Sequence, residues 1–239
     1  MDIKTQGIVL KTVKYGEDRL ITDILTREAG RVAVALRISS SKQSKAKRSL
    51  FQPLNVLDLD IVQTPRQQLA TVREARLAIP YISIPFDGAK LSIAFFLAEF
   101  LHHATREAHC DTPLYDFVAQ SITWLDLASE GTVNFHLMFM LRLSRFLGFM
   151  PDMESYVPHS IFDLREGRFV SVMPLHSDIL PEEDARYLLT LMRMTPATLH
   201  VFRLSRADRN RIVDAILLFY ALHIPAFGTL KSLEVLRNP

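Results

Sequence analysis

A basic, serine-rich stretch near residue 45 is the first feature of the sequence that could do chemistry. Residues 39–49 read SSSKQSKAKRS, and no acidic residue occurs between Glu28 and Asp58. Lysine and arginine bind the phosphate backbone of nucleic acids whatever the base sequence. The stretch therefore favours nucleic-acid binding, although a block of like charge can also be a plain solvated loop. The residues expected to contact phosphate, here and in the preceding segments, are Lys11, Lys14, Arg19, Arg31, Arg37, Lys42, Lys45, Lys47 and Arg48.

A cluster of histidines near residue 105 could bind a metal ion. His102, His103 and His109 accompany Cys110, and on a helix His103 would stand one turn from Glu107. Metal sites use this spacing, but His102 and Cys110 lie among apolar neighbours, which favours ordinary core residues. We expect no metal and no other cofactor.

The acidic residues and the thiol do not form a convincing catalytic pattern. The chain lacks the G-x-x-x-x-G-K-[ST] loop, and its glycines are too sparse for G-x-G-x-x-G. Asp58 with Asp60, and residues 182–184, could hold a metal for phosphodiester cleavage. However, the first pair alternates along a predicted strand, and the second group follows Pro181 in the first helical turn, where acids suit the helix dipole. Cys110 lacks a partner cysteine, so we expect a protein that is not an enzyme.

The composition is that of a globular protein. The 239 residues include 28 Lys plus Arg, 26 Asp plus Glu, 49% apolar residues and one cysteine. A single thiol forms no internal disulfide, which suits the reducing cytoplasm. We also expect neither export nor a membrane span, because the N-terminus lacks an apolar signal region and no run reaches 18 apolar residues.

Residues 1–80 have the pattern of a small β-barrel. They carry 14 basic and 8 acidic residues, a net charge of +6, whereas the rest of the chain has a net charge of −4. Val32, Val34 and Leu36 alternate with polar or small residues, as in a half-buried strand. About five such strands, near 7–14, 19–26, 31–37, 57–61 and 68–75, predict a small antiparallel barrel and permit the oligonucleotide-binding OB-fold.

After residue 80 the hydrophobic period becomes helical. We predict one helix after Pro85 and others near 113–129, 133–148, 182–194 and 206–223, with an irregular or hairpin insertion at 150–180. The predicted fold class is therefore α+β, with a barrel domain at 1–80 and an α-helical domain at 81–239. Along 133–148, an apolar stripe containing Leu137, Met138 and Leu141 is more typical of core than of a binding groove.

Three segments together resemble the RecO family of bacterial recombination mediators. They are residues 7–32 (GIVLKTVKYGEDRLITDILTREAGRV), Gln52-Pro53-Leu54 after the basic stretch, and residues 222–236 (LHIPAFGTLKSLEVL). The resemblance implies an OB-fold followed by a helical domain, binding to single- and double-stranded DNA, and annealing of complementary strands. It also implies partnership with RecR and single-stranded-DNA-binding protein in loading RecA, in the cytoplasm at the nucleoid. The cysteine zinc site of many family members is not implied, because this chain has only Cys110.

The resemblance also suggests a site for the acidic C-terminal tail of single-stranded-DNA-binding protein. Such a peptide needs an apolar pocket with a basic rim. The residues that could supply the pocket floor and rim are Leu137, Met138, Leu141, Arg142, Arg145 and Lys231.

We expect a non-enzymatic DNA-binding mediator that holds DNA mainly by its phosphates. Only two aromatic residues, Tyr15 and Phe51, precede residue 81, whereas binding by base stacking needs several exposed rings. An OB-type RNA-binding module is the alternative, and a metal-dependent nuclease is a third.

Overall fold

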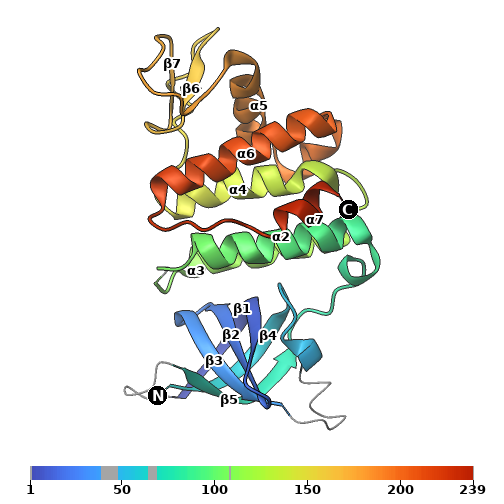
Figure 1. The fold of residues 1–239 in the computed structure, drawn as a ribbon. Coiled ribbons are helices and arrows are strands. Elements are labelled where there is room, and N and C mark those ends of the chain that lie inside the picture. The colour runs from blue at the N-terminus through green and yellow to red at the C-terminus, as the bar shows by residue number, and fades with distance from the viewer. Residues whose placement is uncertain (1, 39–47, 64–68, 108, 239) are drawn as a thin grey trace. The chain divides into compact units, whose positions relative to one another are not determined.

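The computed structural model describes residues 2–38, 48–63, 69–107 and 109–238 (Figure 1). They form two compact units, Met1–Leu127 with Leu230–Pro239, and Ala128–Thr229. The predicted boundary near residue 80 lies inside the first unit, so whether the barrel folds as a separate domain stays a prediction.

The first unit begins with a closed five-stranded barrel, which confirms the predicted α+β class. The strands are β1 (Asp2–Tyr15), β2 (Arg19–Thr26), β3 (Gly30–Arg37), β4 (Val56–Val62) and β5 (Ala70–Leu77). Their order is β1-β2-β3-β5-β4 (Figure 1). The pair β3–β5 is parallel, so the prediction of an antiparallel barrel is wrong for this pair. This order is that of the OB-fold.

Alternating apolar side chains fill the barrel. Val34, Ile24 and Ile61, on three different strands, are fully buried in one core. Gly7 is required on β1, because a Cβ there would lie 2.5 Å from a methyl group of Ile24. The outward-facing residues are left to meet solvent or other elements, as the period of two along a strand dictates.

The first unit includes the helices α2 (Gly88–Ala104), α3 (Thr112–Leu127) and the short α7 (Leu233–Arg237), and the 3₁₀ turn η1 (Ile84–Phe86) precedes α2. The buried carboxylate of Asp126, near the end of α3, accepts hydrogen bonds from three backbone N–H groups, those of Ile82 (2.8 Å), Ser83 (2.9 Å) and Ile84 (2.8 Å). The segment between β5 and α2 is thereby attached to α3.

The second unit is mainly helical. It contains η2 (Thr132–Asn134), α4 (Phe135–Phe146), α5 (Glu182–Arg193), η3 (Pro196–Val201) and α6 (Arg206–His223). Within residues 150–180 a small sheet of order β7-β6-β8 is formed by β6 (Ile161–Asp163), β7 (Arg168–Val170) and β8 (Ile179–Leu180). No helix among the described residues is long and apolar enough to cross a membrane.

Candidate nucleic-acid interface

The outer side of β1, β2 and β3 carries most of the exposed basic residues predicted to bind phosphate. Arg19 on β2 pairs directly with Tyr15 on β1 and with Arg37 on β3, so these three residues form one row across three strands. Lys11 lies on the same side of β1 as Tyr15, whereas Lys14, which pairs with the core residue Leu20 at the end of the strand, points to the other side of the sheet. All five side chains are exposed. Lys11, Tyr15, Arg19 and Arg37 together form a surface, the basic face, that a polyanion can reach.

The predicted loop residues are placed only in part. Lys42, Lys45 and Lys47 lie outside the described residues, and Arg48, the first described residue after them, is exposed. Their part in binding stays a prediction.

Arg31 differs from the other predicted basic residues, because its guanidinium is engaged within the protein. It donates to the Asp23 carboxylate at 3.0 Å and to the His102 carbonyl oxygen at 2.5 Å, and only 13% of its side chain is exposed. The hydrogen bond with His102, and then the charge of Arg31, lower the pKa of Asp23 despite the opposing effect of burial. Arg31 therefore joins the barrel to α2, and the prediction that it contacts phosphate finds no support in this arrangement.

Few aromatic rings lie on the barrel surface. Phe51 is only 2% exposed and belongs to the core, whereas Tyr15 is 62% exposed. Tyr15 was not among the predicted binding residues. The signal that could have found it is its position after Lys11 and Val13, at alternate residues of one strand that ends at the turn glycine Gly16.

The other side of the barrel is acidic. A hollow of about 390 Å³ is lined there by nine residues: Lys4, Thr5, Gln6, Glu28, Asp58, Leu59, Asp60, Glu74 and Arg76. Four of these side chains are acidic and two are basic, a net charge of −2. Asp58 accepts from Gln6 (2.9 Å) and Arg76 (3.1 Å), so it is engaged in a surface network. We call this the acidic side.

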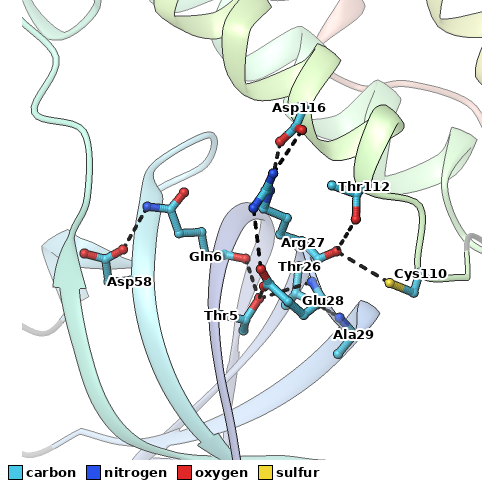
Figure 2. A network of polar contacts seen from close by, with 10 residues as sticks. All are labelled: Thr5, Gln6, Thr26, Arg27, Glu28, Ala29, Asp58, Cys110, Thr112 and Asp116. Carbon is cyan, nitrogen blue, oxygen red and sulfur yellow. Dashed lines mark hydrogen bonds and ion pairs between the residues drawn. The ribbon is translucent and has the colours of Figure 1, made fainter.

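A network of polar contacts fixes the turn between β2 and β3 against α3 (Figure 2). The Arg27 guanidinium donates to both oxygens of Asp116, at 2.9 and 3.2 Å, and lowers the pKa of that carboxyl. The Arg27 carbonyl oxygen lies 3.5 Å from the Thr112 hydroxyl and from the Cys110 thiol. The exposed thiol of Cys110 thus has a weak structural contact.

The histidine cluster does not come together as a ligand set. The His102 Nδ1 lies 3.1 Å from an Asp23 oxygen, so this ring belongs to the joint with Arg31. Burial lowers the pKa of the neighbouring His103, and His109 is exposed. Among the described residues, no three His, Cys, Asp or Glu side chains are grouped so that they could hold a metal. The absence of a metal nevertheless stays a prediction.

The predicted site for an acidic tail is not open in this structure. Leu137, Met138 and Leu141 are between 0 and 3% exposed, inside the core of the second unit. Arg142 donates from its guanidinium to the Met194 carbonyl oxygen, and Arg145 is exposed. Lys231 is exposed in the first unit, whereas the arginines are in the second. Tail binding here stays a prediction, and it would require the three apolar side chains to become accessible.

Comparison with known proteins shows one family along the whole chain. The model "Recombination protein O N terminal" matches residues 1–81, and "Recombination protein O C terminal" matches residues 85–234. The chain is 43% identical over 235 residues to the DNA repair protein RecO of Phocaeicola vulgatus, covering 98% of each protein. It is 37% identical over 241 residues to that of Porphyromonas gingivalis, covering 99% of this chain and 98% of the relative. The two family models match successive parts of the chain, and the relatives align with it over nearly their whole length. The fold agrees, with a five-stranded barrel followed by helices. This chain therefore belongs to the RecO family of DNA repair proteins.

Proposed function

We propose that this RecO family chain is a non-enzymatic mediator that binds single- and double-stranded DNA through the basic face and anneals complementary strands. The observation that carries the proposal is the exposed row that contains Arg19 and Arg37, with Lys11 on the same side of β1. Because these side chains contact phosphate rather than base edges, binding is tolerant of sequence.

The basic face supports annealing by a simple electrostatic route. Two DNA strands repel one another through their phosphates, and cationic side chains that displace counterions reduce that repulsion. A surface that holds phosphates leaves most bases free to pair. The reaction therefore needs neither a catalytic group nor a metal.

The wider role follows from family membership. We infer that the chain acts with RecR to load RecA onto DNA covered by single-stranded-DNA-binding protein, whose acidic C-terminal tail it binds, in the cytoplasm at the nucleoid. Exposed cationic groups such as Arg145 and Lys231 support the contact with the acidic tail.

Annealing of two complementary, labelled oligonucleotides in the absence of divalent metal tests the proposal. The wild-type chain should accelerate duplex formation, and the Arg19→Ala/Arg37→Ala variant should do so more slowly. The matched control is Arg73→Ala/Arg76→Ala, which removes two charges from β5, where they pair with Asp2 and Asp58. This control should anneal like the wild type.

Other outcomes of the same assay contradict the proposal. Faster annealing of RNA strands but not of DNA strands would favour the RNA-binding alternative. Degradation of the oligonucleotides on addition of a divalent metal would favour a nuclease. Equal loss in both double variants would show that overall charge, not the basic face, matters.

A further inference from the structure

Tyr15 is an exposed ring at the end of β1. Tyr15 is 62% exposed, and its side chain forms no hydrogen bond or ring contact with another described residue. The next residue, Gly16, has a φ of +66° and begins the turn to β2. Burial in the core therefore does not explain the choice of an aromatic side chain at this position.

The neighbours of Tyr15 are suited to a nucleotide. Arg19 lies directly opposite on β2, and Arg37 lies opposite Arg19 on β3. Neighbouring strands are about 4.8 Å apart, so the row spans roughly 10 Å, which is about the extent of one nucleotide with its flanking phosphates. Val13, 43% exposed, continues the same side of β1 and offers an apolar edge next to the ring.

We propose that Tyr15 stacks on one base of a single DNA strand whose phosphates contact Arg19 and Arg37, so that the basic face prefers single strands to duplex. This inference rests on the proposed DNA binding by the same surface. It assigns the strand preference to one residue.

The preference follows from which groups each form of DNA exposes. In a duplex the faces of the bases are covered by their neighbours, and the ring could reach one only after unstacking it. In a single strand a base can turn onto the ring, and such stacking is largely indifferent to sequence. Phosphates are exposed in both forms, so the two arginines assist binding to both.

The turn beside Tyr15 limits the direction in which the strand can run. Glu17 and Asp18 are acidic and exposed, so phosphates are disfavoured over the turn itself. The Asp18 to Arg19 ion pair is long, at 4.0 Å, and exposed. Such pairs contribute little, so Arg19 can exchange this partner for a phosphate. The strand should therefore run along the row from Tyr15 to Arg37, beside the turn and not over it.

Fluorescence anisotropy with a labelled thymidine oligonucleotide and a blunt duplex of equal length tests the inference. Tyr15→Ala should weaken single-strand binding about tenfold, within the range for loss of one stacked base. It should change duplex binding less than about twofold and leave the salt dependence unaltered, because tyrosine carries no charge. Tyr15→Phe should bind like the wild type, whereas Tyr15→Leu, which is apolar but has no ring, should bind like the alanine variant. The matched control is Phe86→Ala, which removes an 86% exposed ring outside the barrel strands.

The outcomes separate this inference from the proposed function. If the wild-type chain binds neither DNA, the proposed function fails. If the wild type binds both but Tyr15→Ala leaves single-strand affinity unchanged, weakens duplex binding equally, or matches Phe86→Ala, the inference alone is overturned.

Discussion

Replacing Asp126 by alanine should destabilise the first compact unit by about 3 kcal/mol, because its carboxylate accepts from three backbone N–H groups. The bond from Ile84 is buried, and an unpaired buried donor costs about 1–3 kcal/mol. The bonds from Ile82 and Ser83 are only partly buried. Water can replace the carboxylate there, so each should cost about 0.5–1 kcal/mol.

The measurement is urea unfolding followed by the fluorescence of Trp124. This is the chain's one tryptophan and lies in α3, two residues before Asp126, so it reports on the first unit. For a urea dependence of about 2 kcal/mol per molar, a loss of about 3 kcal/mol lowers the midpoint by about 1.5 M. Asp116→Ala, on the same helix, is the control. Its side chain is 39% exposed and pairs with Arg27, and it should cause a much smaller shift because exposed pairs contribute little.

The dependence on pH gives a second check on Asp126. Burial would raise the pKa of Asp126, but hydrogen bonds from the N–H groups of Ile82, Ile84 and Ser83 lower it below the ordinary value. A carboxyl with a lowered pKa stabilises the fold above the pKa of the unfolded chain, about 3.9 for Asp. That stabilisation is lost as the pH falls through the folded-state pKa.

The stability difference between the wild type and Asp126→Asn should therefore be steady from about pH 5 to 8 and shrink below about pH 4. The reasoning is refuted if Asp126→Ala lies within about 0.5 kcal/mol of the wild type, the range of ordinary surface substitutions.

Four further outcomes are expected. Raising salt from about 50 to about 200 mM should weaken single-strand affinity about 100-fold if about five phosphates are contacted, since the slope is about 0.7 per contact; an affinity nearly independent of salt would contradict this. Arg31→Ala should lower the melting temperature but leave the salt dependence of DNA affinity unchanged, because the Arg31 guanidinium binds other groups of the protein. A weaker salt dependence in this variant would show that Arg31 contacts a phosphate. EDTA should leave melting and annealing unchanged, and stoichiometric zinc that is lost together with folding would show otherwise. Arg145→Ala should weaken binding of an acidic peptide at unchanged melting temperature, whereas Arg142→Ala should also lower the melting temperature because it loses the bond to Met194. Unchanged peptide affinity in both variants would place the site elsewhere.

Local periodicity was sufficient to predict most elements. The alternation of Val32, Val34 and Leu36 identified β3, and the predicted helix at 206–223 coincides with α6. These assignments depend on neighbours in sequence, for which the periods of 2 and 3.6 are informative. The same patterns could not reveal that β3 and β5 pair in parallel, because that pairing depends on closure of the whole barrel.

The uses of individual side chains were harder to predict because they depend on distant partners. In the sequence, Arg31 looks like any other cation of a basic segment. Its structural role is shown only by its hydrogen bond to His102, which is 71 residues away. Glu99 likewise accepts from the backbone N–H and hydroxyl of Ser232, 133 residues away. That contact helps place the C-terminal segment in the first unit, and no local sequence pattern predicts it.

The opposite charges of the two sides of the barrel also bear on how DNA arrives. In the field of a polyanion such a body experiences a torque that turns the basic face towards the DNA before contact. Salt shortens the range of this field to about 10 Å at 0.1 M, so the association rate constant should fall as salt is added. Once one strand is bound, a second strand is repelled from the acidic side, which carries Glu28, Asp58, Asp60 and Glu74. On the proposed mode of binding, the second strand is therefore favoured over the basic face, where the first strand lies.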